Sequence, residues 1–360
     1  MKRSPLYELT QRLGAVFGPY DGWQLPRRFQ SLAQEYDALR QGTVLTDRSH
    51  VGRLRLTGKD ALDLLHRLST NDLLSLEPGR ARGTVLTTGK GRIVDVVTVV
   101  RMPEHLLLLT SPGQQGRVAQ WLDTYTFLEE CAVQDIGQEM ALLSLVGPGA
   151  EEALARAAGP ASVLPRAGEA RGVTLGAAEA VVVRTDPLGL SGYDLLAPWE
   201  QAVAVWQALA APGTANALPA GLEALETARI ENGVGRYGRE YGEAVNPLEG
   251  GLRRLISFTK GCYTGQEVVA RLNTYDKVQR KLVGVVLENK LRIAAGKRPR
   301  LLVDGQEVGY LTSWARPPRR QRWLALGYLR RAHAKVRAQV QVEADGVSFP
   351  ARVASLPFRR

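Results

Sequence analysis

The spacing of hydrophobic and polar residues over positions 1–275 predicts helices mixed with short strands. Apolar residues recur at helical spacing in the segments 31–40, 61–68, 117–128, 150–158, 199–210 and 221–232. Period-two alternation or a short apolar run predicts strands at 53–57, 84–87, 93–100, 141–146, 181–184 and 193–196. The glycine turn Gly89-Lys90-Gly91 joins two of these strands, so a hairpin is expected there. This mixture is typical of an α+β protein.

The pattern changes after residue 276, where the helical spacing stops. Short β-rich runs separated by Gly and Pro follow at 282–287, 306–312, 323–328 and 336–342. Such a series predicts a small β-barrel. A chain of 360 residues with 44% hydrophobic content exceeds what one core needs. We therefore expect two or three domains, with an α+β region over residues 1–275 and a basic C-terminal β-barrel domain over residues 276–360.

Charge is distributed unevenly between these two regions. Residues 276–360 carry 19 Lys+Arg and 6 Asp+Glu, a balance of +13, whereas residues 1–275 carry 28 and 30. A basic barrel would suit an acidic partner such as RNA. However, no aromatic RNA-binding motif interleaves with the charge, and a solvated arginine-rich surface explains the excess equally well. RNA binding through the C-terminal region therefore stays an alternative.

Several classes of site are not expected from this composition. The two cysteines, Cys131 and Cys262, are too few for a disulfide framework, and the four histidines lack metal-ligand spacing, so no metal site is predicted. No apolar run reaches membrane-spanning length, and the first thirty residues lack the apolar core of a signal peptide. We expect a cytoplasmic protein without a membrane partner. The segment Gly147-Pro148-Gly149 lacks the spacing of a nucleotide-binding loop and is predicted to be a turn.

The most informative segment is Lys260-Gly261-Cys262-Tyr263-Thr264-Gly265-Gln266-Glu267. Its cysteine lies in a polar turn between two glycines, which permit positive φ angles and close backbone approach. The nearby Lys260 favours the thiolate form of Cys262. An isolated cysteine is more often a small buried apolar residue, but the octapeptide as a whole favours a functional loop.

This octapeptide resembles the K-G-C-[YF]-x-G-Q-E signature of the YgfZ-type folate-binding proteins, whose fold is similar to that of the glycine cleavage T-protein, an aminomethyltransferase. The resemblance covers nearly the whole chain. It includes Tyr20-Asp21-Gly22-Trp23, Asp47, Ser49, His50, Gly52, Thr70-Asn71-Asp72, Glu226, Arg229, Glu231, Gly233, Tyr237, Gly238, Asn246-Pro247-Leu248-Glu249 and Leu356-Pro357-Phe358. It implies an α+β, T-protein-like folate-binding fold, with ferredoxin-like or antiparallel sheet domains around a central cavity and a C-terminal β-barrel. Residues 1–275 would then form the T-protein-like folate-binding region, made of two interleaved α+β domains.

The same resemblance implies a function. A YgfZ-type protein is expected to bind tetrahydrofolate or a derivative and to act as an accessory protein for iron–sulfur cluster assembly or repair and for tRNA modification. Its partners would then include iron–sulfur enzymes. Cys262 is expected to act at the rim of the central cavity, and a folate-dependent, transferase-like activity is left open.

Two segments depart from the T-protein pattern where that protein places its chemistry. The T-protein's Gly-Gly-[IV]-[IL]-Asp-Asp, which carries the aspartate that handles aminomethyl transfer, corresponds to 91–96, where Asp95 is followed by Val96. The T-protein glutamate that helps to hold the pterin aligns with Leu190. Replacing a carboxylate that bonds buried donors costs about 1–3 kcal/mol per unpaired group. Both changes favour the YgfZ branch.

Four further residues are candidates for the site. The resemblance brings Arg229 and the Tyr193 region to the folate, and Glu226, one helical turn before Arg229, could orient its guanidinium. An ordinary surface ion pair is the simpler explanation of that pair. Asp95 lies in an apolar strand whose alternation favours partial burial and a perturbed pKa. We therefore predict Cys262 and Asp95 as catalytic residues, and Arg229, Tyr193 and Glu226 as folate-binding residues.

Three other functions remain open from the sequence. An aminomethyltransferase is supported by the T-protein-like N-terminal region and by Asp95, and opposed by Leu190, Val96 and the cysteine motif. A demethylase of the same superfamily is another possibility. An RNA-binding module without catalysis would depend only on the basic C-terminal region.

Overall fold

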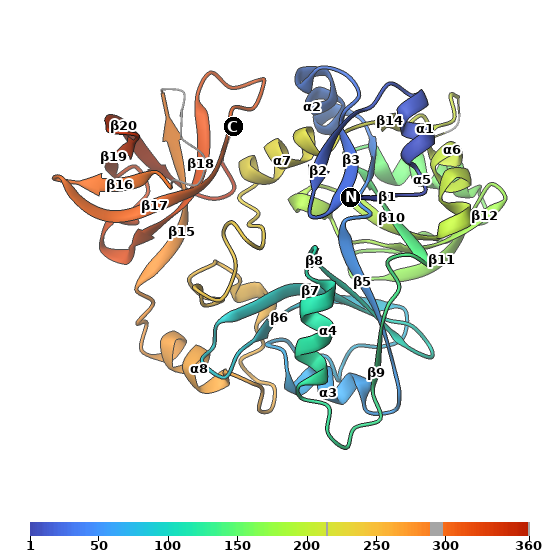
Figure 1. The fold of residues 1–360 in the computed structure, drawn as a ribbon, viewed down its shortest axis with the longest axis horizontal. Coiled ribbons are helices and arrows are strands. Elements are labelled where there is room, and N and C mark those ends of the chain that lie inside the picture. Colours follow the sequence, from blue (N-terminus) through green and yellow to red (C-terminus); the bar gives the residue numbers. More distant parts are fainter. Residues whose placement is uncertain (214, 289–297, 359–360) are drawn as a thin grey trace.

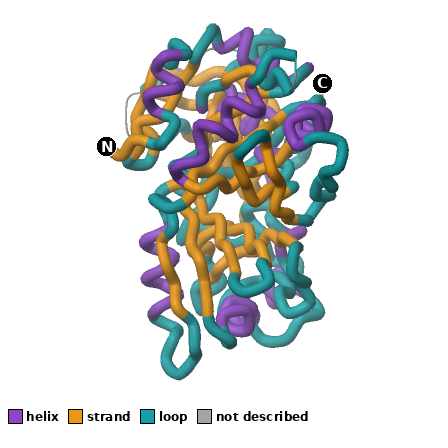
Figure 2. The backbone as a smooth tube through the Cα atoms, turned by 90° about the vertical axis from the view of Figure 1, so that its right-hand side faces the viewer, coloured by secondary structure: helices purple, strands orange, loops and turns teal. Residues whose placement is uncertain are grey.

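The computed structural model describes residues 1–213, 215–288 and 298–358 and shows three lobes around a central region (Figure 1). Two lobes are built on β-sheets, and the third is the C-terminal barrel. Strands gather in the interior, and most helices lie at the periphery (Figure 2). The predicted α+β fold with a C-terminal barrel is confirmed. Among the described residues, no helix is both long and apolar enough to cross a membrane.

The first lobe is a five-stranded antiparallel sheet in the order β6-β7-β8-β5-β9. Its strands are β5 (Val51–Thr57), β6 (Arg80–Thr87), β7 (Ile93–Arg101), β8 (Leu106–Pro112) and β9 (Ala132–Asp135). Two helices, α3 (Ala61–Arg67) and α4 (Gln115–Asp123), pack their apolar residues on one face. The predicted hairpin is confirmed as β6 and β7.

The second lobe is a six-stranded sheet in the order β11-β12-β13-β10-β4-β14. Its strands are β4 (Val44–Asp47), β10 (Met140–Val146), β11 (Ala170–Leu175), β12 (Ala178–Val183), β13 (Gly192–Pro198) and β14 (Leu218–Pro219). The helices α5 (Ala150–Ala158) and α6 (Ala202–Ala210) cover one face. The other face meets the first lobe, since Leu142 and Leu196 pack with Leu107 and Leu109 of β8.

The N-terminal segment and α7 (Leu222–Glu231) complete the second lobe. The other elements here are β1 (Lys2–Arg3), α1 (Tyr7–Arg12), β2 (Val16–Tyr20), β3 (Trp23–Arg28) and α2 (Leu32–Gln41). Ser31 and Gln34 form a capping box at the start of α2. The buried carboxylate of Glu35 accepts hydrogen bonds from the backbone N–H groups of Gln30 and Gly221, each at 2.8 Å, and so ties α2 to the start of α7.

The third lobe is a closed six-stranded barrel in the order β15-β18-β17-β16-β19-β20. Its strands are β15 (Arg280–Leu287), β16 (Arg300–Val303), β17 (Gln306–Ala315), β18 (Trp323–Arg330), β19 (Gln339–Ala344) and β20 (Val347–Ala354). Alternate apolar residues such as Val285, Leu311 and Val353 fill the interior. The sequence pattern did not indicate β20, because Pro350 interrupts its alternation.

Three short helical turns and one helix lie between these elements or beside them. They are η1 (Pro187–Gly189), η3 (Arg253–Leu255), η4 (Arg331–His333) and α8 (Gln266–Thr274). The helix predicted at 199–210 is divided into η2 (Trp199–Gln201) and α6. The sequence analysis missed α8, which begins directly after the cysteine motif, and β8, whose leucine run is buried on both faces and shows no alternation.

Candidate functional site

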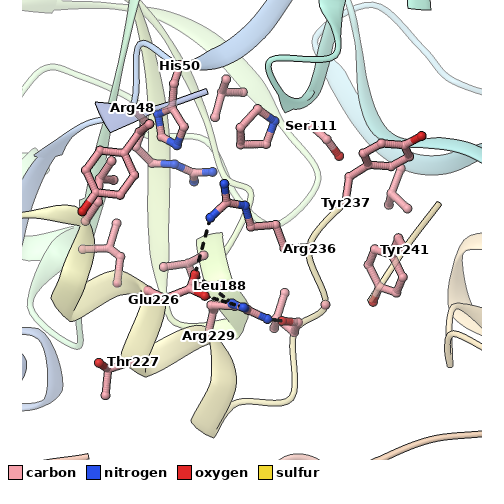
Figure 3. A pocket seen from close by; sticks show the side chains of 18 of the residues that line it. Arg48, His50, Ser111, Leu188, Glu226, Thr227, Arg229, Arg236, Tyr237 and Tyr241 are labelled. Atoms are coloured by element: carbon pink, nitrogen blue, oxygen red, sulfur yellow. Dashed lines mark hydrogen bonds and ion pairs between the residues drawn. The ribbon is translucent and has the colours of Figure 1, made fainter. Parts of the chain in front are cut away.

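A cavity of about 660 Å³ lies where the three lobes meet. The five-stranded sheet, the strands β2 and β3, α7, the loop around 234–241 and the barrel all contribute to its wall, and Figure 3 shows it from close by. A cavity of this size is in the range that encloses a cofactor-sized molecule. The wall therefore combines segments that are far apart in the sequence.

Arg229 of α7 lies in this wall but has no donor free for a ligand. Its Nε donates to Glu226 at 3.0 Å, and one Nη2 bond also reaches Glu226. The remaining Nη bonds go to the backbone oxygen of Val234 (3.3 Å), to Glu240 (2.8 Å) and to Ser313 (2.7 Å). These five bonds use all five N–H groups of the guanidinium. The structure thus gives Arg229 a positioning role, and a direct contact with folate stays an untested prediction.

Glu240 extends this network to the barrel. It is fully buried and also accepts hydrogen bonds from Thr312 Oγ1 of β17 at 2.6 Å and from the backbone N–H of Arg236 at 2.9 Å. Its backbone oxygen accepts from Tyr328 of β18 at 2.8 Å. Burial alone would lower the pKa of Arg229, but Glu240 and Glu226 outweigh it and raise that pKa. The Arg229 guanidinium is therefore charged, and its hydrogen bonds join α7 to the barrel.

Glu226 turns its carboxylate partly toward the cavity, as Figure 3 shows. Burial alone would raise the pKa of Glu226, but Arg229 and Arg236 outweigh it and lower that pKa. The carboxylate is consequently ionised at neutral pH. It is held in place by Arg229 and keeps an exposed edge, so it can accept hydrogen bonds from a ligand. This placement agrees with the folate-binding role predicted for Glu226, which no measurement yet tests.

Positive charge dominates the wall. Six arginines line the cavity, against three carboxylates, Asp194, Glu223 and Glu226. Arg27 pairs with Glu223 at 3.0 Å, and Arg236 pairs with Asp21 at 2.8 Å. Within the described parts of the chain, two of the other arginines, Arg254 of η3 and Arg316 after β17, have neither an ion pair nor a side-chain hydrogen bond. They are available to an anionic group of a ligand.

Aromatic rings and one histidine make up much of the rest of the wall. The rings are those of Tyr20, Tyr237, Tyr241, Trp314 and Trp323. His50 is buried, and its Nδ1 has no hydrogen-bond partner among the described residues. Burial and the nearby Arg48 lower the pKa of His50, so the imidazole is neutral at physiological pH. Flat rings beside unpaired cations suit a planar ligand with an acidic end.

Asp95 lies behind the cavity wall. Its neighbour Val96 and the next alternate residue, Thr98, line the cavity, and Asp95 does not. The carboxylate of Asp95 accepts backbone hydrogen bonds from Val96 at 2.8 Å and from Ser111 at 2.9 Å. Burial raises the pKa of Asp95 to about 6. Asp95 is buried, as the alternation of its strand predicted. Its side chain points away from the cavity, because neighbouring residues of a strand face opposite sides and β7 presents Val96 and Thr98 to the cavity.

Tyr193 is likewise placed outside the cavity, which corrects the position expected for it. The ring packs into the core under α5 and α6, and its hydroxyl accepts a hydrogen bond from Arg184 at 2.9 Å. The next residue, Asp194, faces the cavity and lies 3.8 Å from Arg48. Leu190 is also absent from the wall, whereas Leu188 lines it.

The cysteine motif forms a firmly anchored loop. The ammonium group of Lys260 donates to three backbone oxygens, those of His66 at 2.5 Å, Ser69 at 2.8 Å and Asn71 at 3.0 Å. Burial lowers the pKa of Lys260 to about 8. Tyr263 is buried beside it, with the Lys260 nitrogen 5.2 Å from the ring centre. Lys260 and Tyr263 therefore serve to anchor this loop to the segment 66–71.

The rest of the motif shapes the turn into α8. Gly265 has φ +82°, and a Cβ atom there would lie 2.4 Å from the backbone oxygen of Thr88, so only glycine fits. Gly261 is exposed in the loop, and Gln266 and Glu267 open α8. Cys262 is exposed at the surface and does not line the cavity. The structure therefore does not bring Cys262 and Asp95 together at the cavity, and their catalytic roles stay predictions.

Other cavity residues were not selected from the sequence. Tyr20, His50 and Tyr237 belonged to segments that resemble the family pattern, so the signal was present without a role attached to it. Arg254 lies in the short turn η3 and Arg316 in the loop after β17, and no sequence pattern marks either residue. Among the described residues, no group of three or more His, Cys, Asp or Glu side chains could hold a metal ion.

We expect Arg229→Ala to destabilise the fold strongly, because it leaves the buried Glu240 without a counter-charge. Removing one partner of a buried pair costs about 3–5 kcal/mol. Urea denaturation should show this loss, and adding Glu240→Gln to the variant should recover part of it. Arg236→Ala is the matched control, since its half-exposed pair with Asp21 should cost less than about 1 kcal/mol. Equal effects of the two single variants would contradict the assignment.

Cys262 should react with iodoacetamide before Cys131 does. Cys262 is exposed, whereas Cys131 is half-buried, and burial together with Asp60 raises the pKa of the Cys131 thiol. Because the thiolate is the reacting form, Cys131 should require higher pH. Peptide mapping over a pH series would measure both rates, and equal labelling of the two cysteines at every pH would contradict the prediction.

Comparison with known proteins agrees with this architecture. The model of the GCVT N-terminal domain matches residues 6–260, and that of the glycine cleavage T-protein C-terminal barrel domain matches residues 280–359. An aminomethyltransferase of Symbiobacterium thermophilum is 34% identical over 369 residues, covering 100% of this chain and 98% of its own length. One of Geobacillus kaustophilus is 31% identical over 364 residues, covering 100% and 99%.

The fold is also similar to a solved structure. The crystal structure of glycine cleavage system aminomethyltransferase T from Bartonella henselae superposes with a TM-score of 0.87 at 25% identity, covering 99% of this chain and 98% of that one. These similarities span both sheet lobes and the barrel. The chain belongs to the glycine cleavage T-protein family.

Proposed function

We propose that this protein binds tetrahydrofolate, or a derivative of it, in the central cavity. The observation that carries the proposal is a cavity of about 660 Å³ that combines aromatic rings with two unpaired arginines. Tetrahydrofolate is a flat pterin with hydrogen-bond donors, joined through an aromatic ring to a glutamate with two carboxylates. Its two ends therefore require different partners, and the wall offers both.

The pterin end is assigned to the wall near Glu226. An ionised carboxylate with an exposed edge can accept from two neighbouring N–H groups of the pterin. The tyrosines nearby offer faces for the ring. Arg229 holds Glu226 in orientation through two bonds, so its contribution to affinity is indirect. The glutamate end is assigned to Arg254 and Arg316, whose guanidinium groups have no partner in the described chain.

We expect isothermal titration calorimetry to show tetrahydrofolate binding that Arg254→Ala or Arg316→Ala weakens by about 5–20-fold, which corresponds to about 1–2 kcal/mol. Arg322→Ala is the matched control, because Arg322 is a barrel arginine paired with Glu288 outside the cavity. The absence of heat with any reduced folate would remove the folate assignment. An equal loss in all three variants would remove the assignment of the glutamate end.

For the activity, we propose aminomethyl transfer to the bound folate as the first candidate. The support is similarity over the full length of proteins named aminomethyltransferases. In this chain, however, the cavity face of β7 presents Val96 and Thr98 and no carboxylate. A positioned acid or base contributes about 10²–10⁴-fold to such a step. The transfer should consequently be slow.

The second candidate is the accessory role in iron–sulfur cluster assembly and tRNA modification. It is favoured by the same Val96 and by the exposed Cys262 in an anchored loop. RNA contact by the barrel has less support, since Arg300, Arg319 and Arg331 each pair with a carboxylate. Either activity is proposed to take place in the cytoplasm.

The substitution Val96→Asp separates these activities. In an assay reconstituted with the other glycine cleavage proteins, the wild-type chain should produce methylene-tetrahydrofolate at least about 10²-fold more slowly than the Symbiobacterium relative. Val96→Asp should raise that rate, and Val96→Asn, which adds bulk without charge, should not. A wild-type rate equal to that of the relative would contradict the argument. No turnover in either form would favour the accessory role.

A further inference from the structure

A second, smaller cavity of about 170 Å³ lies against the segment that also lines the central cavity. Arg48 and His50 line the central cavity, whereas Ser49 and Arg53 line the small one. Gln115, the first residue of α4, forms another part of the small cavity's wall. No part of the proposed folate function uses this cavity.

Three polar atoms of residues in this wall have no partner with good hydrogen-bond geometry among the described residues. They are Ser49 Oγ, Arg53 Nε and Gln115 Oε1. The Ser49 hydroxyl also lies near the buried Asp47 carboxyl, whose pKa is raised by burial and lowered in part by Ser4 and Ser49. Ser49 and Arg53 are each only 1% exposed. An unpaired buried polar group costs about 1–3 kcal/mol, so three such atoms around one cavity indicate that an occupant supplies their partners.

The positive charge of Arg53 indicates that the occupant is an anion. Its Nη groups donate only to backbone oxygens, those of Ser49 at 3.0 Å, Val51, and Gly137 at 2.8 Å. No carboxylate lies within ion-pair distance of it in the described chain, although Asp47 and Asp135 act at longer range. Burial lowers the pKa of Arg53 to about 10, so the guanidinium remains charged at neutral pH. A buried cation without a direct counter-charge is costly unless an anion joins it.

Neighbouring groups limit the chemistry of the anion. The Lys2 side chain and the positive end of α4 add to the favourable potential. Asp135 also lines the cavity, and one of its oxygens accepts from the backbone N–H of Gly137 at 2.8 Å. Its carboxylate and Gln115 Oε1 are acceptors, so the occupant must also carry a donor.

We propose that the small cavity binds a small oxyanion that carries a hydrogen-bond donor, such as hydrogen phosphate or a hydroxycarboxylate. The anion accepts from Arg53 Nε–H and Ser49 Oγ–H, and its O–H group donates to Gln115 Oε1. A cavity of about 170 Å³ has room for a molecule of about five heavy atoms, the size of a phosphate. His50 lies between Ser49 and Val51 in the chain, so the occupant also steadies one wall of the central cavity.

Thermal unfolding and calorimetry with sodium phosphate, glycolate, acetate and chloride at constant ionic strength test this proposal. Phosphate or glycolate should bind saturably and raise the Tm by about 2 °C at ten times its Kd. Acetate, which lacks the donor, should bind at least about 5-fold more weakly, and chloride should give no saturable effect. The relative strength of phosphate and glycolate identifies the preferred source of the oxyanion.

Two variants test whether the anion binds at this cavity. Ser49→Ala removes only the hydroxyl and should weaken binding about 5–10-fold without disturbing the buried Arg53. Arg55→Ala is the matched control, since Arg55 lies on the same strand and pairs with Glu139. A crystal grown with arsenate, which like hydrogen phosphate keeps an O–H group at neutral pH, should show its anomalous signal between Arg53 and Ser49. Water alone in the cavity, or an anion effect that Ser49→Ala leaves unchanged, would overturn the proposal.

Discussion

The central cavity depends on the hydrogen bonds and ion pairs of the buried Arg229 guanidinium. This guanidinium binds Glu226 on its own helix, Glu240 in the following loop and Ser313 in the barrel. Because Glu240 is fully buried, the cost of removing these charges from water is offset only while all partners are present. The network therefore holds α7 and the barrel at the separation that leaves the cavity between them.

This constraint divides the cavity wall into fixed and available groups. Glu226 is oriented by Arg229, whereas Arg254 and Arg316 have no partner in the described chain. The wall thus offers a ligand the oriented carboxylate of Glu226 at one place and the unpaired guanidinium groups of Arg254 and Arg316 at another. Aromatic rings such as those of Tyr237 and Tyr241 lie in the same wall and add apolar surface to it.

The sequence predicted the elements better than the orientation of single side chains. The helix at 150–158 and the barrel followed from their periodicity. The positions of Asp95 and Tyr193 did not, since a shift of one residue along a strand exchanges the core face for the cavity face. Nor could periodicity show that Arg229 is saturated, because Ser313 is 84 residues away from it. The motif at 260–267 was recognised, but the backbone oxygens that anchor Lys260 come from a distant helix and the loop after it.

The central claim is that the cavity between the three lobes is a folate site. A crystal structure of the full chain with tetrahydrofolate tests it most directly. The account predicts density for the pterin beside Glu226, with the glutamate carboxylates within hydrogen-bond distance of Arg254 or Arg316. An empty cavity at saturating folate, or a folate bound elsewhere on the molecule, would contradict it.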